Sequence, residues 1–125
     1  MIAVQTLEET DVVIETTHAE RRRFRRYPCQ GAAEAVVLFS ESLFRGEIRD
    51  ISMSGCFIKT KAHLHVDRFS QIDLRFDMND SQYHTKARVM EIRPGCGVGM
   101  EFFYQNPQDE VSFRRLISSV AAQVN

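Results

Sequence analysis

Hydrophobic and polar positions alternate over much of the chain between residues 32 and 103, with the two-residue period of extended strands. Clusters of Ser, Gly, Asn, Asp and Pro interrupt this alternation, as turns do. The pattern predicts six strands, at residues 32–39, 43–50, 55–60, 71–76, 83–93 and 98–103. In the second strand, alternation predicts that Phe44, Ile48 and Asp50 share one face. Six short strands favour a small antiparallel barrel or sandwich.

The end of the chain changes to a helical period. Asn106 is a good N-cap, Pro107 suits the first helical position, and Asp109 and Glu110 complement the positive helix start. Apolar residues then recur at steps of three and four, and they predict a helix over about 107–124 with one apolar face: Phe113, Leu116, Ile117, Val120, Ala121 and Val124. The predicted class is therefore all-β with a C-terminal helix that covers the barrel.

The length of 125 residues indicates one domain. Residues 1–19 show little periodicity, and we expect a flexible acidic N-terminal arm before a domain at 20–125. No apolar run approaches the roughly 20 residues that span a bilayer, and the first residues lack a secretory signal pattern. The three cysteines are widely spaced without a CxxC, which favours reduced thiols and a cytoplasmic location.

The formal net charge of −1 conceals a sharp asymmetry. Residues 1–20 carry five acidic and no basic side chains, whereas Arg21–Arg26 holds five arginines interrupted only by Phe24. Arginine donates in a planar fork that matches phosphate oxygens and the acceptor edge of guanine, and it stacks on bases. By itself the cluster fits a solvated basic run, a general nucleic-acid contact or a specific nucleotide site.

A second stretch, "RDISMSGCF", places Asp50, Ser52 and Gly55 after a predicted strand. A carboxylate there can accept from the ring N–H and amino group of guanine, the edge that arginine does not read. Ser52 offers a hydroxyl, and Gly55 allows close backbone approach. The same three residues also fit an ordinary turn in which Asp50 and Ser52 bond the local backbone. Together with the arginines, they describe a pocket for guanine bases attached to phosphates.

Both stretches resemble the PilZ domain family. Arg22 and Arg26 match its RxxxR motif, and Asp50, Ser52 and Gly55 match its (D/N)xSxxG motif, over a resemblance that covers roughly residues 20–122. Arg21 and Arg25 also satisfy RxxxR, but "RYP" after the second arginine favours the register of Arg22 and Arg26. The resemblance implies a six-stranded antiparallel split barrel that binds the bacterial second messenger cyclic di-GMP.

By the same resemblance, the arginines precede the first strand and wrap over a ligand that lies on the turn of Asp50. An arginine before the motif resembles the family members that bind two stacked ligands, so Arg21 favours an intercalated cyclic di-GMP dimer. Arg23 and Arg25 are possible additional contacts. The family also implies contacts from a later strand, around 86–93, that no motif assigns.

Nothing in the sequence predicts catalysis or a bound cofactor. The four histidines include one close pair, His63 and His65, and no ligand set completes a metal site. A receptor that catalyses no reaction signals ligand binding by changing its shape. We therefore expect the ligand to order the arginine segment and present a new face to a downstream protein. Two alternatives stay open: a basic barrel that binds single-stranded nucleic acid, which Asp50 disfavours because its charge repels phosphate, and a PilZ-like adaptor that no longer binds ligand.

Overall fold

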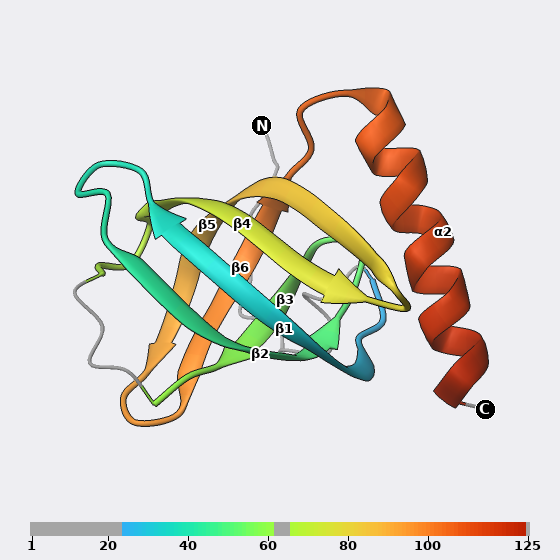
Figure 1. Cartoon of the computed structure of the whole chain (residues 1–125), viewed down its shortest axis with the longest axis horizontal. Helices are drawn as coiled ribbons and strands as arrows, with labels where there is room; N and C mark the ends of the chain where they lie inside the picture. Colours follow the sequence, from blue (N-terminus) through green and yellow to red (C-terminus); the bar gives the residue numbers. More distant parts are fainter. Residues whose placement is uncertain (1–23, 62–65, 125) are drawn as a thin grey trace, which may run out of the picture.

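The computed structural model describes residues 24–61 and 66–124, so the predicted arm of residues 1–19 lies outside the described residues. Antiparallel strands close into a barrel in the order β1-β2-β3-β6-β5-β4 (Figure 1). This arrangement confirms the predicted six-stranded barrel and excludes the sandwich. The elements are β1 Tyr27–Val37, β2 Leu43–Ile51, β3 Gly55–Lys59, β4 Gln71–Met78, β5 Ser81–Arg93, β6 Gly97–Phe103 and the helix α2 Pro107–Val124.

The barrel interior is filled by aliphatic and aromatic side chains from all six strands. β4 shows the alternation most clearly, because Ile72, Leu74, Phe76 and Met78 are buried while the residues between them are not. Branched side chains pack well on such a pleated surface. The interior is thus a packed core, and any ligand site has to lie on the outer surface.

β1 begins at Tyr27 rather than at residue 32 and ends at Val37 rather than at residue 39. Its first part pairs only with β2, and its pairing with β4 starts at Ala33. Pro28 is tolerated there because one edge of the strand is unpaired and needs no N–H donor. At the other end the chain leaves the sheet in a turn that exposes 98% of Phe39.

β2 does not keep the predicted alternation to its end. Ile48 faces Ile58 and Asp50 faces Phe57, so β2 contains one more residue than β3 between these pairs, which is a β-bulge. The bulge buries Ile51 as completely as Ile48. The prediction that Asp50 shares the face of Phe44 and Ile48 was therefore wrong, because the extra residue turns the Asp50 side chain outward.

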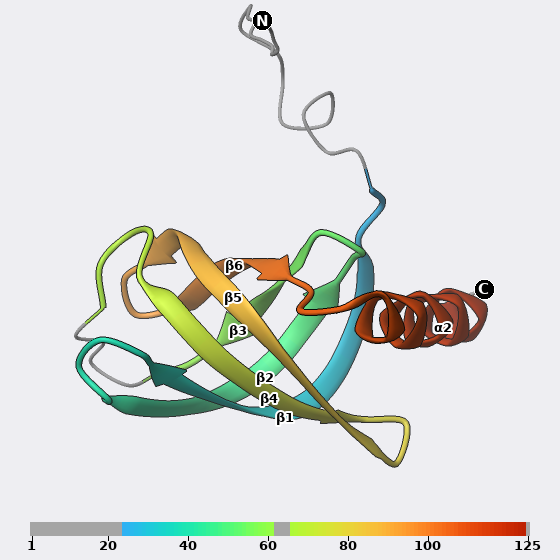
Figure 2. The same ribbon diagram turned by 90° about the horizontal axis from the view of Figure 1, so that it is seen from above.

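The helix α2 lies beside one end of the barrel (Figure 2). The Asn106 side chain caps it by accepting a hydrogen bond from the backbone N–H of Asp109 at 2.8 Å, as predicted. Phe113 then packs edge-on against four aromatic rings, with centroids 5.1–5.8 Å away: Phe76, Tyr83, Phe102 and Tyr104. This cluster covers the end of the barrel.

The β4–β5 turn fixes the far end of the helix. Asn79 and Asp80 both have positive φ, 52° and 65°, as a two-residue turn of type I′ requires. The Asn79 amide donates to the Ser119 hydroxyl at 3.1 Å and accepts from the Gln123 amide at 3.2 Å. In the described part of the chain, no helix is sufficiently long and apolar to span a membrane.

Replacing Phe113 with Ala should lower the free energy of unfolding by about 3–5 kcal/mol, because it leaves a cavity among the rings that the helix covers. Urea denaturation followed by circular dichroism measures this loss. Val111→Ala on the exposed side of the same helix is the matched control, since Val111 is 41% exposed. Equal losses for the two variants would contradict the packing described for α2.

Candidate functional site

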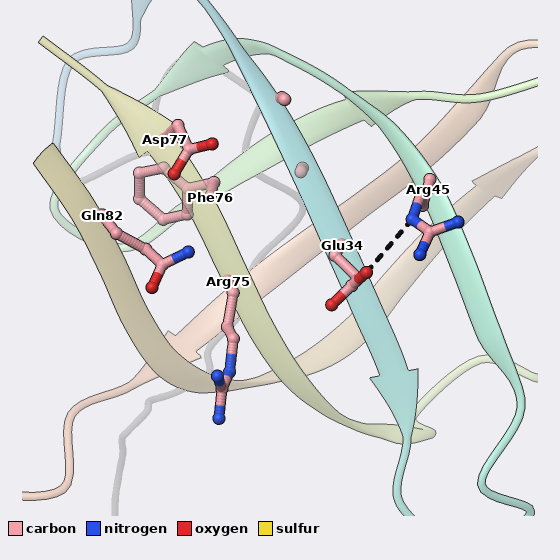
Figure 3. Close-up of a pocket in the computed structure, with 8 residues that line it drawn as sticks. Glu34, Arg45, Arg75, Phe76, Asp77 and Gln82 are labelled. Carbon is pink, nitrogen blue, oxygen red and sulfur yellow. Dashed lines mark hydrogen bonds and ion pairs between the residues drawn. The ribbon is translucent and has the colours of Figure 1, made fainter. Parts of the chain in front are cut away.

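A hollow of about 260 Å³ lies on the outer surface where β1 meets β4 (Figure 3). Its charged groups include the ion pair of Arg45 and Glu34, 3.1 Å from Nε to Oε2. None of the residues predicted to bind ligand lines it. The hollow is therefore not the candidate site, which lies elsewhere on the barrel.

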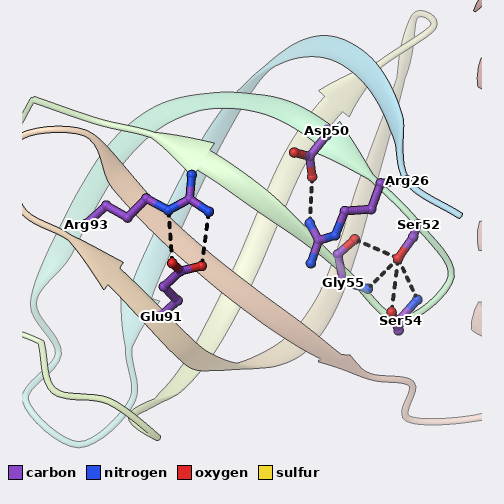
Figure 4. A network of polar contacts seen from close by, with 7 residues as sticks. All are labelled: Arg26, Asp50, Ser52, Ser54, Gly55, Glu91 and Arg93. Atoms are coloured by element: carbon purple, nitrogen blue, oxygen red, sulfur yellow. Dashed lines mark hydrogen bonds and ion pairs between the residues drawn. The ribbon is translucent and has the colours of Figure 1, made fainter. Parts of the chain in front are cut away.

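The candidate site begins with an ion pair between the two predicted motifs. Arg26 Nη1 donates to Asp50 Oδ1 at 2.7 Å (Figure 4). Arg26 lies just before β1, and Asp50 lies beyond the bulge of β2, where it pairs with Pro28. The side chains are 29% and 34% exposed, so water screens the pair and it stabilises the fold by about 0–1 kcal/mol. The last arginine of the cluster and the acid-bearing turn thus meet on one surface.

Ser52 organises the turn that follows Asp50. It is fully buried, and its hydroxyl accepts hydrogen bonds from the backbone N–H groups of Ser54 at 3.1 Å and Gly55 at 3.3 Å. The Ser54 hydroxyl lies 3.0 Å from the Ser52 hydroxyl (Figure 4). This is the local backbone bonding that Ser and Asp favour in turns. Ser52 therefore fixes the shape of the turn from its buried side.

Gly55 is required by the neighbouring strand. A Cβ atom at this position would lie 2.0 Å from the carbonyl oxygen of Met100 in β6, far inside van der Waals contact. The absent side chain allows β3 to begin directly after the turn and to pair with β6. Of the (D/N)xSxxG residues, Asp50 has the exposed polar side chain, and the other two fix its position.

A row of residues crosses the outer surface from Asp50. Asp50 in β2 faces Phe57 in β3, Phe57 faces Gly99 in β6, and Gly99 faces Glu91 in β5. A second extra residue, between Val89 and Glu91 in β5, adjusts the register at the end of the row. Because Gly99 has no side chain, the outer surface is recessed between Phe57 and Glu91. Phe57 is half-buried there.

Arg93 lies across this row. Its guanidinium carbon is 4.8 Å from the centre of the Phe57 ring, a cation–π distance. Its Nε and one terminal nitrogen donate to the two Glu91 oxygens at 3.0 and 3.3 Å (Figure 4). The hydrogen bonds and charge of Glu91 raise the pKa of Arg93, with a smaller contribution from Asp50. The two ion pairs therefore belong to one electrostatic surface.

Three predicted contacts, Arg21, Arg22 and Arg23, lie outside the described residues. Arg25 is described, and its guanidinium carbon lies 5.4 Å from the centre of the Tyr27 ring. Phe57, Glu91 and Arg93 line the surface without having been singled out from the sequence. Glu91 and Arg93 fall within the stretch around 86–93 where the family resemblance implies contacts, but the proximity of all three residues to Asp50 depends on pairing through β6.

The described side chains of this surface are suited to recognition, and the neighbouring Cys29 thiol is not activated as a nucleophile. Burial, and next the charge of Asp50, raise the pKa of the Cys29 thiol to about 12, so it carries little thiolate at neutral pH. No cluster of three or more His, Cys, Asp or Glu side chains in the described ranges could hold a metal ion. Two carboxylates, two guanidinium groups and an aromatic ring instead fit a planar ligand that has both donors and acceptors.

Comparisons with known proteins agree with this fold. The structure is similar to the PilZ domain of YcgR from Escherichia coli with c-di-GMP, at a TM-score of 0.69 and 18% identity over 82% of this chain and 93% of that chain. It is also similar to the PilZ domain of CeSA from a cellulose-synthesizing bacterium, at a TM-score of 0.66 and 21% identity over 78% and 98% of the two chains.

The MrkH–c-di-GMP complex of K. pneumonia gives a TM-score of 0.71 at 13% identity, over 82% of this chain and 52% of MrkH. A comparison with curated proteins gives no match. The sequence model of the PilZ domain matches residues 20–119, which include both motifs and all six strands. The chain therefore belongs to the PilZ domain family.

Proposed function

We propose that this protein is a receptor for cyclic di-GMP that binds the ligand between its arginine segment and the turn of Asp50. The observation that carries the proposal is the 2.7 Å contact between Arg26 and Asp50, which brings the two motifs to one surface. The solved structures of the YcgR PilZ domain and of MrkH, each with c-di-GMP, support the choice of ligand.

Each group then has a role that its chemistry suits. The Asp50 carboxylate accepts from the ring N–H and amino group of one guanine, and Arg22 and Arg26 donate to phosphate oxygens and to the opposite guanine edge. Ligand binding has to separate Arg26 from Asp50. That step costs little, because an ion pair with this exposure is worth only about 0–1 kcal/mol.

The bound form we propose is an intercalated dimer of cyclic di-GMP. Arg21 precedes the RxxxR motif, as in the family members that bind two ligands, and two ligands bring four phosphates that need additional cations. Arg93 adds a guanidinium plane beside Phe57 on which a second guanine can stack. Arg23 and Arg25 supply further positive charge at the same surface.

Signalling follows from ordering the arginine segment. Without ligand, the five arginines repel one another, and the acidic residues of the N-terminal arm screen them. The ligand neutralises the cluster, orders the part of the arginine segment that precedes Arg26 on the barrel and displaces the arm, which presents a new face to a downstream protein. Single-stranded nucleic acid is the less favoured ligand, because Asp50 and Glu91 lie within the surface and repel a phosphate backbone.

Calorimetric titration with cyclic di-GMP should show two ligands per chain. Asp50→Ala and Arg22→Ala should each reduce affinity by about 2–5 kcal/mol, because each leaves a charged ligand group without its partner. Asp50→Asn keeps one acceptor oxygen and should lose less. Arg45→Ala, which breaks the exposed ion pair beside the hollow of Figure 3, is the matched control. Full affinity of Asp50→Ala would refute the assignment.

Ser52→Ala should act on the fold before it acts on binding. It leaves two backbone N–H groups of the turn without their acceptor, at a cost of about 1–3 kcal/mol in the free energy of unfolding. Ser42→Ala is the control, because the Ser42 hydroxyl contacts Ser40 in an exposed turn and its loss should cost no more than about 0.5 kcal/mol. An unfolding curve of Ser52→Ala identical to the parent would reject this structural role.

Deleting residues 1–19 tests the screening role of the arm. The truncated protein should bind cyclic di-GMP more tightly than the full chain at low salt, since the arm no longer competes for the arginines. The difference should vanish at about 1 M salt, where the Debye length is about 3 Å. Equal affinities of the two proteins at both salt concentrations would reject screening while leaving the receptor proposal intact.

A further inference from the structure

A second surface of the barrel exposes aromatic side chains that the nucleotide site does not use. Two hollows of about 400 and 440 Å³ adjoin each other and share Leu38 and Gln71. Three aromatic side chains border them, Phe39, Phe69 and Phe103, which are 98%, 53% and 42% exposed. We call this surface the aromatic groove. Apolar side chains gathered around a concave surface mark an interaction site more often than scattered ones.

The groove is built from four separate segments that backbone pairing holds together. The Leu38 N–H donates to the Gln71 carbonyl at 2.9 Å, which joins the β1–β2 turn to the start of β4. Phe69 donates to the Val89 carbonyl at 2.7 Å, which joins the same segment to β5. Phe103 ends β6, next to β5. The β1–β2 turn lies at the side of the barrel away from α2 (Figures 1 and 2).

Phe69 is held exposed at a conformational cost. Its φ of 73° is in the left-handed region, which bulky residues other than glycine rarely adopt. Two backbone hydrogen bonds to β5, one from Phe69 and one accepted by Ser70, keep it there. An exposed ring in a strained, fixed backbone has no role in the core, and strain of this kind gathers at functional sites.

Guanidinium groups complete the groove. The guanidinium carbon of Arg88 is 5.0 Å from the Phe103 ring centre and 5.7 Å from that of Phe69, so it lies between the two rings. Arg68 lies 4.8 Å from the Phe69 ring centre. Arg88 pairs with Glu101 at 3.1 Å, whereas Arg68 makes no ion pair within residues 24–61 and 66–124. The groove therefore has a surplus cation beside an apolar surface.

From these contacts we propose that the aromatic groove docks a segment of a partner protein that carries two apolar side chains next to a carboxylate. The hollows accept the apolar side chains, and Arg68 pairs with the carboxylate. A nucleic acid fits less well, because the Glu101 carboxylate beside Arg88 would repel its phosphates. The aromatic groove shares no residue with the nucleotide site, and its docking role does not depend on the proposed receptor function.

A display library of random 12-residue peptides, selected on the full chain without nucleotide, tests this proposal. Selected peptides should pair apolar residues with Asp or Glu, and a synthetic copy of the most enriched one should bind by fluorescence anisotropy. Phe69→Ser and Arg68→Glu should each weaken that binding about tenfold or more, as loss of a central interface residue does. Val111→Ser on the outer side of α2 should bind as the parent does.

Thermal unfolding and cyclic di-GMP titration of the same variants separate this proposal from the receptor function. Phe69→Ser should melt within a few degrees of the parent and should bind cyclic di-GMP just as the parent does, since Phe69 lies outside the row of Asp50 and Phe57. The proposal is overturned if no peptide is enriched, if enriched peptides are basic, or if Phe69→Ser binds them as well as the parent. Preferential binding of a labelled oligothymidine, or self-association that Phe69→Ser abolishes, would also overturn it.

Discussion

One extra residue in β2 determines how this barrel presents its site. The bulge between Ile48 and Asp50 allows both Ile48 and Ile51 to enter the core, where each is completely buried. A regular strand with Ile48 in the core would have placed Asp50 in the core and Ile51 on the outside, because side chains alternate strictly. The same extra residue turns the Asp50 side chain toward Arg26 and places Asp50 opposite Phe57 in β3. The requirement to bury two isoleucines and expose a carboxylate thus explains why the strand is irregular at the site.

In the turn beyond the bulge, some residues support the backbone and another presents its side chain at the surface. Ser52 is buried and satisfies two backbone donors, and Gly55 admits the carbonyl of Met100 from β6. Ser52 is buried and Gly55 has no side chain, so neither presents a polar side chain at the surface, yet both fix where Asp50 lies. A motif defined by three residues therefore contains one group with an exposed charge and two that serve the backbone, which is the arrangement expected when a recognition group must be held rigidly.

The ion pairs of the site can be broken at a low cost in free energy. Arg26 with Asp50 and Arg93 with Glu91 are both partly exposed pairs, and water weakens each of them. In the complex that we propose, phosphates and guanine edges of the ligand would replace these contacts with stronger, less hydrated ones. The aromatic groove is different in kind, since Phe69 is fixed there by backbone pairing with β5 and the groove does not depend on mobile charges. β5 and β6 carry residues of both surfaces, with Gly99 facing the first and Glu101 the second.

The sequence by itself determined the elements and indicated candidate site residues. Alternation located all six strands, the Asn106–Pro107 start located the helix, and the two motifs selected Arg26 and Asp50, because these features depend on local periodicity and short spacings. Only the tertiary structure decided that Asp50 points outward and that Ser52 is buried. It also decided that Phe57, Glu91 and Arg93 lie on the same surface as Asp50. Those facts follow from bulges and strand register, which are fixed by pairing between segments distant in the chain. The aromatic groove has the same origin, since the hydrogen bonds that bring Leu38 to Gln71 and Phe69 to Val89 join residues that no local pattern connects.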